Sequence, residues 1–149
     1  MPLNLSYEGH SFPPGEPYLV GREKIREFAR AVGADDAAYH DPEAAAALGH
    51  PDVIAPPTFP TVLTIPLAAR LFAEHPDVGI DFSRIVHGDQ RFAYERPVRA
   101  GDALVCRPVL EKLSSRAGLD SVSVRTEIVT VEGELVVTSW AKIVARTEA

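Results

Sequence analysis

Residues 58–70, which read TFPTVLTIPLAAR, decide the fold of this chain. Their apolar side chains are distributed around a helix instead of along one stripe, and a helix that is apolar all round is a buried helix. Pro60 suits the first turn of such a helix, whereas Pro66 lies inside it and should kink or interrupt it. We therefore expect a buried helix between residues 58 and 75, around which the rest of the chain folds.

Downstream of Pro76 the hydrophobic pattern changes to a period of two residues, which is typical of β-strands. The period slips at Val129 and Val131, which indicates a β-bulge. His87 and Asp89 fall on one face of the first strand, where we expect a surface or interface pair. The expected strands, joined by short turns into an antiparallel meander, cover residues 85–94, 103–113, 122–131 and 135–143.

Two short helices are expected upstream of the buried helix. The first spans residues 22–32, where apolar side chains recur at the spacing of one helical face before Gly33 stops the helix. The second starts at Asp41-Pro42-Glu43, which supplies an N-cap, a first-turn proline and a first-turn acid, and it ends at Gly49. A buried helix followed by a twisted antiparallel sheet has one economical packing, in which the sheet wraps the helix. We therefore expect an α+β chain of hotdog architecture, with residues 1–149 forming one domain.

The composition excludes several classes of function. Fifteen basic and 21 acidic residues leave a formal net charge of −6, so the basic footprint of a nucleic-acid-binding protein is absent. No apolar run reaches membrane-spanning length and the start of the chain lacks the pattern of a signal peptide, so we expect a cytoplasmic protein. The only cysteine, Cys106, alternates with Leu104 on a strand face and is expected to pack in the core. Neither a zinc-type ligand spacing nor a glycine-rich phosphate loop is present, so no metal or cofactor is expected.

Four segments resemble one enzyme family over nearly the whole chain. The chain is similar to the MaoC-like (R)-specific hydratases and dehydratases and, within them, to the HadA-type subunits of (3R)-hydroxyacyl-ACP dehydratase, which have a FAS1-like dehydratase domain. The resemblance implies a hotdog fold and chemistry on 3-hydroxyacyl or 2-enoyl thioesters. It rests on Gly21–Ala29, Asp35–Tyr39, Ala55–Phe59 and Phe92–Asp102.

The resemblance also implies an acid/base pair. Catalytic members of the family carry a Gly-Asp-x-Asn-Pro-x-His motif, and Asp35 and His40 fall on its aspartate and histidine, with alanines at positions 34, 37 and 38 in place of Gly, Asn and Pro. Elimination of water needs a base for the α-proton and an acid for the leaving hydroxyl, and the spacing leaves open which residue takes which role. The alternative is that Asp35 and Asp36 only finish one helix or cap the next, and that His40 is a surface residue before the Asp41 cap.

A third requirement of the reaction is a hydrogen-bond donor to the thioester oxygen. In active relatives an Ala-His-Gly-like segment supplies backbone N–H groups at the start of the long helix. Here Pro56 and Pro57 stand at the corresponding positions and have no N–H to donate, so Thr58 is the candidate donor. The predicted substrate-binding residues are Pro57, Thr58, Phe59 and Val62.

Three functions remain open from the sequence. The first is a subunit of a (3R)-hydroxyacyl thioester dehydratase or trans-2-enoyl hydratase that acts on acyl-ACP or acyl-CoA. The second is a non-catalytic subunit that binds the acyl chain and stabilises a heterodimeric dehydratase, and the third is a hotdog acyl thioesterase. Because one hotdog unit has an incomplete acyl tunnel, we expect a homodimer or a heterodimer with a second MaoC-like hotdog subunit.

Overall fold

The computed structural model describes residues 2–148. Three α-helices are present, α1 (Arg22–Ala31), α2 (Pro42–Ala47) and α3 (Thr61–Glu74), together with four short 3-10 helices, η1 (Leu5–Tyr7), η2 (Ala37–Tyr39), η3 (Pro76–Val78) and η4 (Phe82–Arg84). The five strands are β1 (Tyr18–Leu19), β2 (Val86–Tyr94), β3 (Ala103–Arg116), β4 (Leu119–Thr130) and β5 (Leu135–Arg146).

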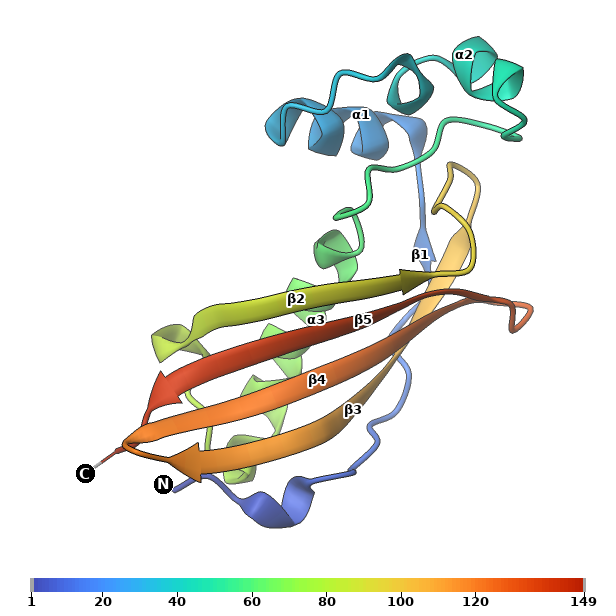
Figure 1. Cartoon of the computed structure of the whole chain (residues 1–149). Coiled ribbons are helices and arrows are strands. Elements are labelled where there is room, and N and C mark those ends of the chain that lie inside the picture. Colours follow the sequence, from blue (N-terminus) through green and yellow to red (C-terminus); the bar gives the residue numbers. More distant parts are fainter. Residues whose placement is uncertain (1, 149) are drawn as a thin grey trace.

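All five strands form one antiparallel sheet in the order β1-β3-β4-β5-β2, and the sheet curls around α3 (Figure 1). This arrangement confirms the expected hotdog architecture. The expected meander is correct for β3, β4 and β5 but wrong for β2, which pairs with β5 at the far edge instead of with β3. The reason is the 95–102 connection, which does not form a tight hairpin but pairs with residues 53–55 through an Ala55 N–H to Val98 O bond of 2.7 Å and an Ala100 N–H to Val53 O bond of 3.0 Å.

Helix α3 differs from its prediction in two respects. Residues 57–60 form a turn before it, and it then runs unbroken through Pro66 to Glu74. Pro66 removes one backbone donor, but its ring is exposed and displaces nothing in the core. The helix is also not buried all round, because the sheet covers Leu63, Leu71 and their neighbours while Ile65 on the other side is 46% exposed.

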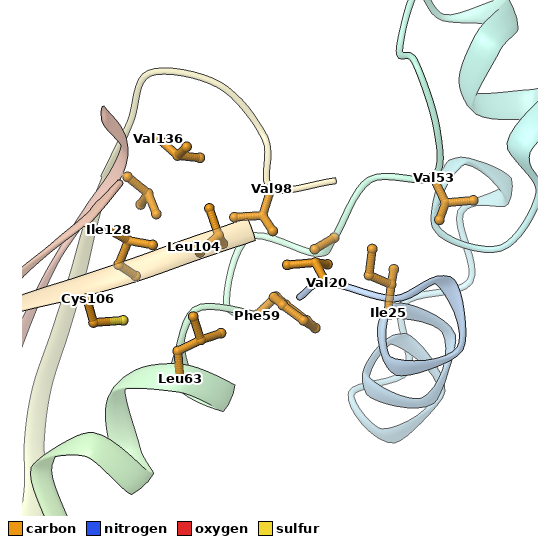
Figure 2. Packing of buried hydrophobic residues seen from close by; sticks show 12 residues of the cluster. Val20, Ile25, Val53, Phe59, Leu63, Val98, Leu104, Cys106, Ile128 and Val136 are labelled. Carbon is orange, nitrogen blue, oxygen red and sulfur yellow. The ribbon is translucent and has the colours of Figure 1, made fainter. Parts of the chain in front are cut away.

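The core consists of two clusters along α3. The first joins α1, the 53–59 segment and one end of the sheet, and Figure 2 shows Phe59 between Leu104 on the sheet side and Ile25 on the helix side. The ring of Phe59 is fully buried and meets Phe28 edge to face, with the ring centroids 5.5 Å apart. Cys106 also lies in this cluster, as expected. Burial raises the pKa of its thiol to about 12, so the thiolate does not form near neutral pH.

The second cluster lies at the other end of α3. There Leu71 and Phe72 of the helix pack against inward-facing side chains of the sheet, among them Leu113, Val122 and Ile143. These residues alternate along each strand with exposed or half-buried ones, which face away from α3. The sheet therefore has an inner face that covers the helix and an outer face that does not.

Two local predictions are confirmed. The Asp41 carboxylate caps α2 by accepting the Glu43 N–H at 2.9 Å, with Pro42 in the first turn. The pairing of β4 with β5 is irregular between Ile128 and Val129, where the sequence pattern slips. Both features follow from contacts between residues close in sequence.

The expected pairing of His87 with Asp89 on one strand face is wrong. His87 lies opposite the buried Ile143, whereas Asp89 lies opposite the exposed Lys142. The register between β2 and β5 shifts at Gly88, so the two side chains point to opposite faces of the sheet. A spacing of two residues keeps side chains on one face only where the ladder is regular.

The two edges of the sheet differ in whether another segment of the chain lies along them. Residues 9–15 run along β3, where backbone bonds join Gly9 N–H to Leu110 O at 2.7 Å and Phe12 N–H to Pro108 O at 3.1 Å. Within residues 2–148 no segment lies along the outer edge of β2, whose only partner is β5. An open edge nine residues long is a ready site for pairing with another strand.

An ion pair holds the 95–102 connection. The Arg96 guanidinium donates to both carboxylate oxygens of Asp102, at 2.9 and 2.8 Å, and to Glu134 at 3.0 Å. Asp102 is buried and also accepts the Arg99 N–H at 2.9 Å. The pair therefore positions the connection, which in turn pairs with the segment leading into α3.

Replacing Arg96 with Met should destabilise the protein by about 3 kcal/mol, because it leaves the buried Asp102 carboxylate without its partner. Chemical denaturation measures the loss. The matched control is Arg22→Met, which breaks the more exposed pair with Asp52 and should cost less than about 1 kcal/mol. Equal losses in the two variants would contradict the positioning role of Arg96.

Candidate active site

Asp35 lies in the loop between α1 and α2. Gly33 turns the chain after α1 with a φ of 72°. The residue after Asp35, Asp36, caps η2 by accepting the Ala38 N–H at 2.9 Å. Of the two acids for which the sequence left a capping role open, Asp36 takes it and Asp35 does not. The Asp35 side chain is exposed, and within residues 2–148 it forms no hydrogen bond or ion pair. Its carboxylate is thus available to a ligand.

His40 is held on the same loop. Its Nε2 atom lies 3.0 Å from the Ala34 carbonyl oxygen, and its own carbonyl accepts from the Arg26 guanidinium at 2.9 Å. A carbonyl oxygen only accepts, so Nε2 carries the proton in this contact and Nδ1 keeps its lone pair in the neutral ring. Among the described residues no hydrogen bond or ion pair joins His40 to Asp35. The structure brings the two side chains onto one loop but does not pair them.

The 53–58 segment lies directly beside this loop. The Ile54 N–H donates to the Ala38 carbonyl of η2 at 3.1 Å, which ties the loop to the residues that lead into α3. Beyond it, Pro57 and Thr58 are exposed, Phe59 is fully buried in the first core cluster, and Val62 is half buried. The four predicted substrate-binding residues are therefore contiguous with the loop, although Phe59 points into the core.

Thr58, in the turn before α3, carries donor groups without a hydrogen-bond acceptor in the described chain. Pro56 and Pro57 have no N–H, and the Phe59 N–H donates to the Pro56 carbonyl at 2.9 Å. Within the described chain the Thr58 N–H and hydroxyl form no hydrogen bond, and both are at the exposed turn. Thr58 is thus the residue that can donate to an oxygen placed at this end of the helix.

A cavity of about 410 Å³, which we call the Tyr94 pocket, opens beside this turn. The Tyr94 hydroxyl donates to the Pro57 carbonyl at 2.6 Å, and burial raises the pKa of the phenol, so the hydroxyl stays protonated. Sequence reasoning missed Tyr94, because its partner lies 37 positions away in the chain. The pocket is lined by Tyr39, Ile54, Ala55, Pro57, Tyr94, Glu95, Arg96 and Pro97.

A second cavity of about 410 Å³, which we call the α3 cavity, runs along the helix. It is lined by the apolar side chains of Val62, Leu63 and Leu67 of α3 and by Tyr18 of β1. Arg70 and Glu16 also line it. Along the chain, Thr58 lies between Pro57, which lines the Tyr94 pocket, and Val62, which lines the α3 cavity, and it lines neither cavity itself.

Residues 2–148 contain neither a cluster of metal-binding side chains nor a helix that could span a membrane. No group of three His, Cys, Asp or Glu side chains is placed to hold a metal ion. None of the helices in this range is long and apolar enough to cross a membrane.

The family model of the FAS1-like dehydratase domain region matches residues 6–139. A UPF0336 protein of Streptomyces coelicolor is 56% identical over 98% of this chain and 97% of its own length, and one of Thermobifida fusca is 46% identical over 100% and 97%. The same fold and sequence pattern recur in a solved structure of the C-terminally truncated HadBC (3R-hydroxyacyl-ACP dehydratase) complex of Mycobacterium tuberculosis. It is 35% identical, with a TM-score of 0.83 over 97% of this chain and 100% of that one.

A likeness of fold alone extends further. The (R)-hydratase of A. caviae involved in PHA biosynthesis is 19% identical, with a TM-score of 0.66 over 93% of this chain and 96% of that one. At this identity the comparison shows a common architecture and no more.

Replacing Tyr94 with Phe should cost about 1 kcal/mol of stability, because the hydrogen bond from the Tyr94 hydroxyl to the Pro57 carbonyl is lost. Tyr39→Phe is the matched control, since the Tyr39 hydroxyl lines the same pocket without a hydrogen bond in the described chain. Thermal unfolding of both variants measures the difference. A Tyr39→Phe variant that loses as much stability would show that the bond to Pro57 is not what matters.

Proposed function

The chain belongs to the family of the FAS1-like dehydratase domain, and on that premise we propose that it is a HadA-type subunit of a (3R)-hydroxyacyl thioester dehydratase. In the reverse direction the same enzyme hydrates trans-2-enoyl thioesters. The observation that carries the proposal is the likeness, over the full length of both chains, to a chain of a (3R)-hydroxyacyl-ACP dehydratase complex.

The substrate we propose is an acyl thioester of ACP or CoA in fatty acid metabolism. The apolar wall that Val62, Leu63 and Leu67 give to the α3 cavity suits an acyl chain, which has only methylene groups to bury. Thr58 precedes Val62 by four residues in the chain, and we place the thioester of a bound acyl chain beside it. The reaction is a proton transfer coupled to loss or addition of water and requires no cofactor.

Asp35 and His40 are the proposed acid/base residues. Dehydration breaks the α C–H bond and the β C–O bond, and the hydroxyl leaves as water once it receives a proton. His40, whose Nε2 proton is bound by the Ala34 carbonyl, takes the α-proton on Nδ1 and becomes an imidazolium. This proton then passes to the departing hydroxyl, directly or through the Asp35 carboxylate; with the two roles exchanged the carboxylate takes the proton first. Both side chains lie on a loop whose backbone is fixed by Arg26 and by the bond from Ile54 to Ala38.

The thioester oxygen gains negative charge as the α-proton leaves. We propose that the Thr58 N–H, in the turn that precedes the 14-residue helix α3, donates to this oxygen. The positive end of the helix dipole adds to this stabilisation. With prolines at positions 56 and 57, the site has one backbone donor there instead of a series of them.

A second function is favoured by specific observations, namely a non-catalytic subunit that binds the acyl chain for a catalytic partner. The prolines remove backbone donors near the thioester, and Asp35 and His40 are not joined by a hydrogen bond. The two cavities beside α3 serve this function equally well. The two functions differ in whether the purified chain turns over substrate alone.

We also propose that the chain works as a dimer, preferably with a second MaoC-like hotdog subunit. The outer edge of β2 has no strand partner within residues 2–148, and the side of α3 that carries Ile65 is not covered by the sheet. A partner that extends the sheet at β2 would cover both. The similar HadBC protein was solved as a complex.

Hydration of a short trans-2-enoyl thioester by the purified chain tests the catalytic assignment, with loss of the conjugated enoyl absorbance as the readout. Asp35→Asn and His40→Ala should each lower the rate about a hundredfold or more, because each removes a proton-transfer group. Glu43→Gln and His50→Ala are the matched controls and should retain the rate. Full activity in either site variant would refute the pair, and no activity in a folded wild-type chain would favour the non-catalytic subunit.

The dimer is tested by size-exclusion chromatography with light scattering. Ile65→Lys should shift the protein toward the monomer, since it places a charge on the uncovered apolar side of α3. Leu48→Lys changes a still more exposed leucine at the end of α2 and should leave the mass unchanged. The proposal would be contradicted by a wild-type chain that elutes as a monomer both by itself and when mixed with a second MaoC-like subunit.

A further inference from the structure

A groove of about 390 Å³ lies on the outer face of the sheet, near the hairpin that joins β3 to β4 at the end remote from α1 and α2 (Figure 1). We call it the outer-face groove. Its residues alternate along the strands with the inward-facing side chains of the second core cluster, so it opens on the side away from α3. The groove is lined by Lys112, Ser114, Arg116, Leu119, Ser121, Ser123, Lys142 and Val144.

The strand register arranges these side chains in rows across the sheet. Lys112 lies opposite Ser123, which lies opposite Lys142, so a serine is flanked by a lysine on each side. Neighbouring strands are about 4.8 Å apart, which puts the two lysine Cα atoms about 10 Å apart. Lysine side chains are long enough that both ammonium groups could contact one group bound above Ser123. The next row places Ser114 opposite Ser121 and adds two more hydroxyls.

Within the described chain no ion pair engages the cations of the groove. Three cations and no acid line it, in a chain of net charge −6. Lys112, Arg116 and Lys142 form no ion pair within residues 2–148, and Asp89, which is opposite Lys142 at the sheet edge, forms none either. The nearby Glu111 is paired with Arg125 at 3.8 Å. Lys112 and Lys142 lie on either side of Ser123, so an anion bound above this serine is within reach of both ammonium groups.

The hydroxyls add directed donors to this charge. Within residues 2–148 the side chains of Ser114, Ser121 and Ser123 form no hydrogen bond, whereas the neighbouring Ser115 points inward and donates to Asp120 at 2.6 Å. A phosphate group carries up to two negative charges and several acceptor oxygens. Ammonium, guanidinium and hydroxyl groups together satisfy both properties.

We propose that the outer-face groove binds a small phosphate-bearing molecule. The groove is separate from the Tyr94 pocket: Tyr94 lies opposite Val137, and the groove begins at Lys142, five residues or about 17 Å further along β5 and on the other face of the sheet. Binding there does not depend on the dehydratase function proposed above. Its loss would leave the chemistry at the start of α3 unchanged.

The test is an amide NMR titration of the full chain with inorganic phosphate, pyrophosphate and adenosine 3′,5′-bisphosphate at constant ionic strength. We expect shifts confined to residues 112–123 and 142–144, and saturable binding. Lys112→Gln with Lys142→Gln should weaken binding about tenfold or more, since two charge-assisted hydrogen bonds are lost. Tighter binding of the bisphosphate than of inorganic phosphate identifies a nucleotide-type ligand, and equal binding identifies free phosphate.

The matched control removes the same charge elsewhere. Arg30→Gln with Arg107→Gln replaces two exposed arginines outside the groove and should change the affinity less than twofold. Thermal unfolding verifies that both double variants are folded. Shifts spread over the whole surface, equal weakening by both double variants, or binding only of an acidic protein and not of the small phosphates would overturn the proposal.

Discussion

The contact between one side of α3 and the curled inner face of the sheet is the constraint on which the rest of the structure depends. It divides the core into a cluster around Phe59 and a cluster around Phe72, and it fixes which side chains of every strand point inward. The other side of the helix, which carries Ile65, is not covered by the sheet. The exposed side of α3 and the open edge of β2 are the two surfaces that the proposed partner subunit would cover.

The candidate site is assembled by backbone contacts between three segments that are distant in the chain. The loop that carries Asp35 and His40 is tied to residue 54, residues 53–55 pair with the 95–102 connection, and the ion pair of Arg96 with Asp102 holds that connection in place. The turn before α3 is then clamped by Tyr94. The acid/base candidates and the free Thr58 donor thus depend on the sheet end for their position, although none of them belongs to a strand.

Local patterns predicted what depends on local contacts. The cap of α2 at Asp41, the irregularity after Ile128 and the burial of Cys106 follow from side-chain spacing within one element. The placement of β2 beside β5 was not predictable in this way, because it depends on where a long connection crosses the end of the sheet. The bulge at Gly88 likewise has no signature in the alternation that it interrupts.

The site was predictable only in part for the same reason. Position in a motif pointed to Asp35 and His40, but the hydrogen bond from His40 to Ala34 and the clamp from Tyr94 to Pro57 arise from the folded chain. The two prolines before Thr58 could be recognised from sequence, and their chemical consequence follows from the missing N–H alone.

The central claim is that the space beside α3 binds an acyl thioester, whether this chain or a partner does the chemistry. The most direct measurement is an amide NMR titration with an acyl-pantetheine analogue in which an amide replaces the thioester. We expect shifts at Thr58, Val62 and Leu67 that grow with acyl-chain length. Shifts that are absent from the helix, or that do not depend on the acyl chain, would contradict it.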